Sequence, residues 1–393
     1  MKEGFLLVAP LYFLEVFHVK NQQVTNTSID AFSGKITNYE RAMLEFGIQD
    51  ISEIADSLEG RMNHKYFRRR LIFGHTDAKK VFEAIEAKKP FAIMTGIKPT
   101  GKYHIGSLIT CNEVLYYQSL GAKVYFCIAD MEGYLHNGVP LERAHQIAID
   151  NIADILALGL EPKTAYIYKQ SEEHNVLRLA SLFSRNVTYN MMRAIYGEQA
   201  FGAYQSALIQ IGDILLPQLP DYEGPLPTIT PVGLEQAPHS RLSRDIARKK
   251  IHQERFGFIL PSFTFHKILG SLDGGQKMSK SAGTAFILTL SETEKSLQRK
   301  ISNIITGGRE TKREQKAKGG RIDDCRIFDL FKFYFTDDDQ LLTKREHACK
   351  SGELLCGECK QELFDQALPF IEKHCEKKEQ KLALARQLVE GQK

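Results

Sequence analysis

The segment Phe91-Ala-Ile-Met-Thr-Gly-Ile-Lys-Pro-Thr-Gly-Lys-Tyr-His-Ile-Gly-Ser107 decides the fold. It opens with a short apolar run, which predicts a buried strand over residues 91–95. A turn rich in glycine follows, and the apolar spacing after it predicts a helix over Ile105–Leu120. A strand that passes through such a turn into a helix is typical of the first unit of a parallel sheet.

The chain beyond this segment repeats the alternation. The pattern predicts strands at Lys123–Ala129 and Ala165–Tyr168, with a helix at Leu141–Leu160 between them. Helix signals then dominate residues from about 170 to 225, and a further strand is predicted at Pro227–Gly233. The sequence therefore predicts an α/β fold in which a Rossmann-type parallel sheet carries a helical insertion.

Helical patterns also flank the predicted sheet. Tyr39–Phe46 and Ala78–Ile85 have the apolar periodicity of helices packed on one face, and the chain after residue 285 shows it again. We expect four regions: an N-terminal extension (1–30), a helical N-terminal region (31–90), the α/β domain (91–284, with its insertion at about 170–225) and an all-α C-terminal domain (285–393).

Charge and cysteine content bound the class of protein. The 52 Lys and Arg residues against 48 Asp and Glu give a net charge of +4, which is too small to require a polyanionic partner. Basic clusters at 68–70, 244–250 and 309–321 are suited to phosphate, although solvated helix faces explain them equally well. The seven cysteines are scattered and odd in number, which favours a reducing compartment, so we expect a cytoplasmic protein.

The apolar stretch Gly4–Val16 does not predict a membrane span. It contains Pro10 and Glu15, is too short to cross a bilayer and lacks a clear signal-peptide cleavage site. We interpret it as a divergent N-terminal extension or the product of an upstream start codon, and we expect no membrane partner.

The C-terminal cysteines invite a zinc hypothesis. Cys356-x-x-Cys359 would need further ligands from Cys349, Cys375, His347 and His374. The pair lies in a predicted helix without a second Cys-x-x-Cys pair, so unliganded thiols are the favoured interpretation. We therefore expect no metal-binding residues.

The turn after the first predicted strand is suited to an anion. The helix N-terminus there points out of the carboxyl edge of the sheet, where backbone N–H groups and the helix dipole favour phosphate. Small residues allow a nucleotide to approach closely and basic ones can donate to its phosphates: Gly96, Gly101, Gly106, His104, Lys98 and Lys102. An ordinary strand-to-helix turn explains this segment alone equally well.

A second loop, Gly274-Gly-Gln-Lys-Met-Ser-Lys-Ser281, contains two lysines and two serines beside glycines. A lysine pair of this kind suits a pyrophosphate that gains charge as it leaves. A generic basic surface loop is the alternative for this segment alone. The combination of both loops, about 170 residues apart and in the order that the fold requires, favours nucleotide chemistry.

The two loops resemble the signatures of the class I aminoacyl-tRNA synthetases. His104-Ile-Gly-Ser107 is similar to HIGH, and Lys277-Met-Ser-Lys-Ser281 is identical to KMSKS. Ser107 departs from the signature, because its hydroxyl can donate a hydrogen bond but carries no charge. The resemblance implies catalytic roles for His104, Lys277 and Lys280. It implies an ATP site formed by Gly96, Lys98, Pro99, Thr100, Gly101, His104, Gly106, Ser107, Gly233, Glu235, Met278, Ser279, Lys280 and Ser281.

The stretch between the two loops indicates the amino acid. Val232-Gly-Leu-Glu-Gln-Ala-Pro-His239, followed by Arg241-Leu-Ser-Arg-Asp-Ile-Ala247, resembles the archaeal and eukaryotic tryptophanyl-tRNA synthetases. Further likeness, from about Ile36 to the C-terminus, includes Ile128–Glu132, Thr306–Arg309, Gly319-Gly320 and Ser351–Leu355. The resemblance implies that Gln236 and Glu132 bind the substrate ammonium and that Glu235, usually Asp in this group, lies near the ATP ribose.

The expected side-chain pocket departs from that group. Its members often have a tyrosine and a glutamine near the indole nitrogen, where this chain has Met94 and Cys127. Simple core packing is the alternative for both residues. If they line the pocket, shape and aromatic contact recognise the indole, with Asp213 as a polar partner. The implied amino-acid site comprises Met94, Cys127, Glu132, Gln210, Asp213, Gln236 and Asp273, the last where a glutamine is usual. For His239 and His266 we favour structural hydrogen bonding.

The resemblance implies activation of L-tryptophan by ATP and Mg²⁺ and its transfer to tRNA(Trp), by a homodimer whose helical domain binds the anticodon. A tyrosyl-tRNA synthetase is one alternative, because it shares the fold and a Gly-x-Glu-Gln segment like 233–236. A catalytically weak paralogue that only binds RNA or a partner is the other, suggested by Ser107 and the altered pocket.

Overall fold

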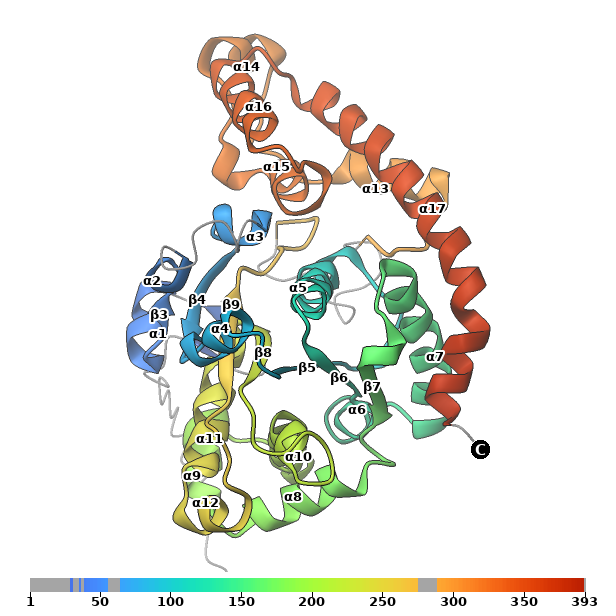
Figure 1. Cartoon of the computed structure of the whole chain (residues 1–393). Coiled ribbons are helices and arrows are strands. Elements are labelled where there is room, and N and C mark those ends of the chain that lie inside the picture. The colour runs from blue at the N-terminus through green and yellow to red at the C-terminus, as the bar shows by residue number, and fades with distance from the viewer. Residues whose placement is uncertain (1–28, 31–34, 37–38, 56–63, 275–287, 392–393) are drawn as a thin grey trace, which may run out of the picture.

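The computed structural model describes residues 29–30, 35–36, 39–55, 64–274 and 288–391. A seven-stranded sheet in the order β3-β4-β9-β8-β5-β6-β7 forms its centre (Figure 1). The strands are β3 (Gln49–Asp50), β4 (Ile72–Thr76), β5 (Ala92–Ile97), β6 (Lys123–Ile128), β7 (Ala165–Lys169), β8 (Thr228–Gly233) and β9 (Ser262–His266). A separate pair comprises β1 (Ile29–Asp30) and β2 (Lys35–Ile36).

The neighbouring strands β9, β8, β5, β6 and β7 are parallel, which confirms the predicted α/β fold. Successive side chains of β5 enter different cores: Ile93 joins the one shared with α5 (Leu108–Ser119) and α7 (Leu141–Leu158), and Met94 joins the other. Because both faces are covered, β5 is apolar on both, as the sequence pattern indicated.

The region before β5 departs from the expectation of helices alone. α1 (Tyr39–Phe46) and α4 (Lys79–Glu86) confirm the two helical patterns, and the short α2 (Ser52–Ala55) and α3 (Lys65–Arg68) accompany them. However, β3 and β4 lie in the same region and extend the sheet, with β4 antiparallel to β9. Neither β4 nor β9 was predicted, because strands of five residues whose partners lie far along the chain leave little periodic signal.

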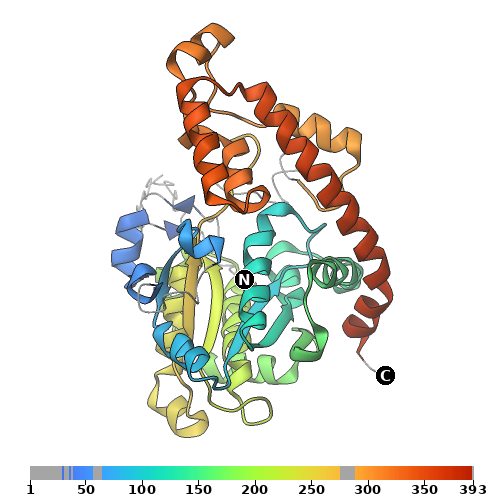
Figure 2. The same cartoon turned by 45° about the horizontal axis from the view of Figure 1, so that its top comes forward.

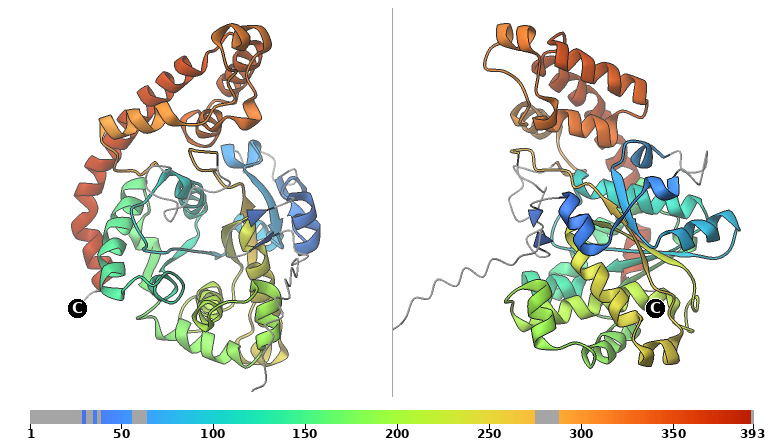
Figure 3. Two further views of the ribbon diagram at one scale, coloured as in Figure 1. Left: turned by 180° about the vertical axis from the view of Figure 1, so that it is seen from behind. Right: turned by 90° about the vertical axis from the view of Figure 1, so that its left-hand side faces the viewer.

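The predicted insertion is helical and packs on the second core. Its helices are α8 (His174–Ser184), α9 (Tyr189–Tyr196) and α10 (Phe201–Leu215), and α10 packs against α8 and α6 (Asp130–Asn137). α11 (Ala237–Ala247) and α12 (Lys250–Phe256) follow β8 on the same side of the sheet (Figure 3). The insertion therefore covers the face of the sheet that bears Met94.

Helices form the C-terminal region, as predicted, above the sheet in Figure 2. They are α13 (Glu294–Asn303), α14 (Lys312–Lys318), α15 (Arg326–Leu330), a short π-helix (Phe331–Phe335), α16 (Asp339–Ser351) and α17 (Cys356–Glu390). The long α17 runs along α7, where His374 Nε2 and Asp154 Oδ1 are 2.8 Å apart (Figure 1). Lys378 Nζ donates to the other oxygen of this buried carboxylate at 2.9 Å.

No described helix is both long and apolar enough to cross a bilayer.

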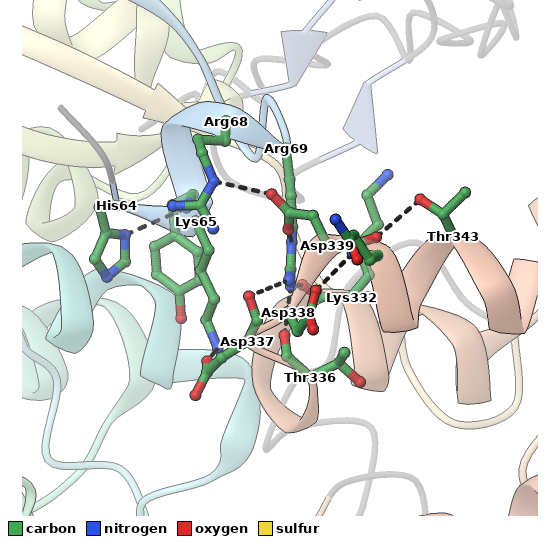
Figure 4. Close-up of polar contacts among 12 residues, drawn as sticks. His64, Lys65, Arg68, Arg69, Lys332, Thr336, Asp337, Asp338, Asp339 and Thr343 are labelled. Atoms are coloured by element: carbon green, nitrogen blue, oxygen red, sulfur yellow. Dashed lines mark hydrogen bonds and ion pairs between the residues drawn. The ribbon is translucent and has the colours of Figure 1, made fainter. Parts of the chain in front are cut away.

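A second polar contact joins the N-terminal region to the helical region (Figure 4). The buried Arg69 side chain donates to Asp339 Oδ1 at 2.6 Å and to the carbonyl oxygens of Lys332 and Thr336 at 2.6 and 2.7 Å. Lys65 Nζ donates to Asp337 Oδ1 at 2.6 Å. The helical region is thus anchored to the sheet-bearing part of the molecule at two separate places.

Candidate active site

Two adjoining cavities lie at the carboxyl ends of the parallel strands. Ile97 and Ile128 are paired in the β5–β6 register, so the turns that follow these strands meet at one edge of the sheet. The larger cavity has a volume of about 780 Å³ and the smaller about 310 Å³. Their common wall is formed by Thr95, Gly96, Lys98, Thr110 and His136.

The larger cavity is lined by most of the described residues predicted to bind ATP: Gly96, Lys98, Thr100, His104, Gly106, Ser107, Gly233 and Glu235. A side chain at Gly96 would bring its Cβ within 2.9 Å of the Cys127 carbonyl oxygen, so the strand ends fit together only with glycine there. Pro99 and Gly101 do not line this cavity. The Gly101 carbonyl instead accepts a hydrogen bond from Asn151 Nδ2 at 3.1 Å, which ties the turn to α7.

The second predicted loop falls in a gap of the structure. Lys277, Met278, Ser279, Lys280 and Ser281 lie outside the described residues. The chain resumes beside the first loop, because Ile105 N donates to Leu288 O at 2.8 Å and Leu290 N donates to Tyr103 O at 3.1 Å. The residues that follow the gap therefore pair with the turn that carries His104.

The smaller cavity collects residues predicted to bind the amino acid. Six of them line it: Met94, Cys127, Glu132, Gln210, Asp213 and Gln236. Asp273 is different, because its side chain is exposed, accepts a hydrogen bond from the Ser271 hydroxyl and lines neither cavity. The structure does not bring Asp273 to the site.

Asp213 supplies a buried acid to the smaller cavity. Its carboxylate accepts hydrogen bonds from Tyr168 Oη at 2.9 Å and Gln170 Nε2 at 2.6 Å. Burial raises the pKa of Asp213 to about 7, against the opposing effect of these hydrogen bonds. Burial and the nearby carboxylate raise the pKa of Cys127 well above its ordinary value. Asp213 therefore changes charge near neutral pH, whereas Cys127 stays a neutral thiol.

Two histidines for which the sequence favoured structural roles also line the cavities. His239 Nδ1 is 2.6 Å from Tyr196 Oη, and burial lowers the pKa of His239 to about 4, so its ring is neutral. The residue lines the smaller cavity, and its buried Nε2 has no hydrogen-bond partner among the described residues. His266 lines the larger cavity, with Nδ1 3.5 Å from the buried Glu113 carboxylate. Glu113 was not predicted from the sequence, because it lies inside α5 and belongs to no recognisable motif.

An ion pair lies at the common wall. Lys98 Nζ is 2.8 Å from Glu132 Oε1, and the two side chains are 34% and 17% exposed. The parallel register explains the contact, since Lys98 follows β5 directly and Glu132 lies in the first turn of α6, just beyond β6. A residue predicted to bind phosphate thus contacts one predicted to bind an ammonium group.

Metal-ligand clusters of three or more His, Cys, Asp or Glu side chains are absent from the part of the chain that the structure describes. Cys356 and Cys359 lie in the first turn of α17, and burial raises the pKa of Cys359 to about 12. A thiol with such a pKa is protonated at neutral pH.

Comparisons with known proteins agree with one another. The family model described as "tRNA synthetases class I (W and Y)" matches residues 86–371. The tryptophan--tRNA ligase of Methanocaldococcus jannaschii is 35% identical over 362 residues, covering 91% of this chain and 96% of the relative. That of Aeropyrum pernix is 36% identical over 363 residues, with the same coverage. The crystal structure of the Aeropyrum pernix tryptophanyl-tRNA synthetase superposes with a TM-score of 0.84 at 34% identity, over 92% of this chain and 98% of that one.

Proposed function

Since the chain belongs to the class I tRNA synthetases of the tryptophan and tyrosine group, we propose that it activates L-tryptophan with ATP and transfers the product to tRNA(Trp). The observation that carries this proposal is the pair of adjoining cavities at the carboxyl edge of the parallel sheet. One is lined by the HIGH-like turn and the other ends at the buried Asp213. Two substrates bound there would meet at the common wall, to which β5 contributes Thr95 and Gly96.

Activation needs positioning and charge stabilisation rather than a protein nucleophile. A carboxylate oxygen of the amino acid attacks the α-phosphorus of ATP, the bond to the bridging oxygen breaks, and pyrophosphate leaves with that electron pair. His104, Lys98 and the Ser107 hydroxyl line the larger cavity as donors to phosphate oxygens. Lys277 and Lys280 are proposed to stabilise the leaving pyrophosphate.

Mg²⁺ fits the donor set of the larger cavity only as an ion carried by ATP. Protein sites for Mg²⁺ use carboxylates together with substrate phosphates, and Glu235 is the acidic residue that lines this cavity. When bound, the ion would neutralise phosphate charge. Glu235 is proposed to contact the ribose instead, with Gly233 leaving space beside it.

The smaller cavity suits an aromatic amino acid. We assign its ammonium group to Glu132 and Gln236 and its indole N–H to the Asp213 carboxylate, which lies beside Gln210 in the same cavity. Met94 and Cys127 supply an apolar wall in place of further polar contacts. Both residues stay uncharged, so hydrogen bonding to the indole rests on Asp213.

Charging requires further partners. We propose that the helical region binds the tRNA anticodon through its basic residues and that the enzyme acts in the cytoplasm. A homodimer is supported by exposed apolar side chains on neighbouring helices of the insertion and α6: Tyr134, Tyr189, Met191 and Phe201.

Pyrophosphate exchange into ATP, driven by single amino acids, tests the function. We expect exchange with tryptophan and aminoacylation of tRNA(Trp) transcripts. Exchange with tyrosine alone would overturn the substrate and indicate a tyrosyl-tRNA synthetase. Absence of exchange with every amino acid, together with retained RNA binding, would instead identify a paralogue that only binds.

A further inference from the structure

The Lys98–Glu132 ion pair joins the two cavities across their common wall. Lys98 lines both cavities, whereas Glu132 lines only the smaller one. Within the described residues, Glu132 is the sole hydrogen-bond or ion-pair partner of the Lys98 ammonium. The carboxylate that would bind the ammonium of the amino acid is therefore already occupied by an ammonium of the protein.

We propose that Lys98 is exchanged between the two substrate sites: the amino acid displaces it from Glu132, and the released lysine then binds ATP phosphate. This inference rests on the proposed function of both cavities. The α-ammonium of the substrate and Lys98 Nζ carry the same charge and the same kind of donors, so they compete for one carboxylate. Displacement leaves a cation without a counterion at the edge of the nucleotide cavity.

Charge at the wall determines the direction of the coupling. While Lys98 is paired with Glu132, the pair is neutral overall and offers little attraction to phosphate. Once the substrate ammonium neutralises Glu132, the positive charge of Lys98 becomes available to ATP, and a charge-assisted hydrogen bond to phosphate forms. Amino-acid binding should therefore strengthen ATP binding, and by linkage ATP should strengthen amino-acid binding by the same factor.

The groups beside the ion pair are not expected to replace Lys98 as the partner of Glu132. Burial, followed by the positive charge of Lys98, lowers the pKa of His136, which makes its ring a weaker competitor than Lys98 for Glu132. The backbone N–H of Glu132 donates to Gln170 Oε1 at 3.1 Å, which fixes the start of α6 while the carboxylate exchanges its partner. The movement required is confined to the Lys98 side chain.

Binding of an unreactive ATP analogue with a methylene bridge between the α- and β-phosphorus tests the exchange by calorimetry. We expect its Kd to fall by about tenfold in saturating tryptophan. Tryptamine, which keeps the ammonium and lacks the carboxylate, should have a similar effect. Indole-3-propionate, which lacks the ammonium, should have none. Equal effects of tryptamine and indole-3-propionate would overturn the proposal.

A double-mutant cycle isolates Lys98. Lys98→Met should abolish the tryptophan effect on analogue binding, and Glu132→Gln should tighten analogue binding in the absence of tryptophan because Lys98 is then free. The second effect should vanish in the Lys98→Met background; its persistence would mean that Glu132 repels ATP directly. Lys89→Met, an exposed lysine at the opposite edge of the sheet, is the matched control and should keep the coupling.

Failure of this inference is distinguishable from failure of the proposed function. The chain contains no tryptophan, so the indole fluorescence of bound tryptophan reports directly on occupancy of the smaller cavity. No tryptophan binding with or without the analogue would contradict the proposed function. Tryptophan binding that leaves the analogue Kd unchanged would contradict only the exchange of Lys98.

Discussion

A single buried carboxylate should make the smaller cavity, the proposed amino-acid site, sensitive to pH. The pKa of Asp213 is raised by burial to about 7, so the group is largely protonated at pH 6 and largely ionised at pH 8. The ionised form is the stronger acceptor for an indole N–H. We expect tryptophan affinity to rise by about tenfold between pH 6 and pH 8, as the fraction of ionised Asp213 does. Titration of indole fluorescence at several pH values measures this.

Asp213→Asn provides the control, with opposite expected effects on binding and stability. Tryptophan affinity should become weaker and independent of pH in this range. Because the folded-state pKa is raised, ionisation of Asp213 destabilises the native protein as the pH rises from about 4 to about 7. The variant lacks this loss and should be more stable than the parent at pH 8, by up to roughly 4 kcal/mol. If the tryptophan affinity of the variant changed with pH as that of the parent does, the proposed role of Asp213 would be contradicted.

At the scale of elements, the apolar patterns of short segments predicted the helices and strands that depend on residues close together in the sequence. The apolar runs of β5 and β6 were predicted close to their observed bounds, and α10 lies within the segment of about 170–225 predicted to be helical. β4 was missed inside a region predicted to be helical, because its partner β9 lies almost 190 residues further along. The candidate site shows the same difference between features formed by contiguous residues and features formed by distant ones. Its glycine-rich turn is contiguous and was recognised, whereas the hydrogen bonds that Asp213 accepts join segments 43 and 45 residues apart.

The packing of α10 determines where Asp213 lies. A Cβ at Gly212 would approach the Val176 carbonyl oxygen of α8 to 2.7 Å. We therefore expect Gly212→Ala to push α10 away from α8, with destabilisation of about 1–3 kcal/mol despite the helix preference of alanine. Tryptophan affinity should fall more than ATP affinity, because Gly212 adjoins Asp213 and only the smaller cavity includes α10. Denaturant unfolding and the two ligand titrations measure these effects.

Gly357→Ala in α17 is the matched control. Nothing lies within 4 Å of a Cβ built at Gly357, so only the intrinsic preference acts there. Because Gly357 lies in the first turn of α17, the expected change is stabilisation by at most about 0.5–1 kcal/mol, with both affinities unchanged. If Gly212→Ala were also stabilising, the close approach of α10 and α8 would not be what fixes Asp213.

At the scale of the molecule, the anchors between the helical region and the sheet separate the two steps of the reaction. In the proposed function, activation takes place within the two cavities, whereas transfer also requires the tRNA end to reach them while the helical region holds the anticodon. The buried Arg69 connects α3 to Asp339 and to the carbonyl oxygens of Lys332 and Thr336 (Figure 4). A change there should affect the orientation of the helical region before it affects the cavities.

We expect Arg69→Ala to destabilise the protein by about 1–3 kcal/mol, because it leaves the partly buried carbonyl oxygens of Lys332 and Thr336 without their donor. Aminoacylation of tRNA should fall several-fold more than pyrophosphate exchange in the variant. Arg68→Ala is the control: Arg68 contacts the same Asp339 carboxylate at 2.9 Å, but its side chain is 36% exposed. An exposed pair contributes at most about 1 kcal/mol, so this variant should keep both activities. Equal losses of exchange and aminoacylation in Arg69→Ala would mean that the contact supports the whole fold, and that the orientation of the helical region is set at the α17–α7 contact instead.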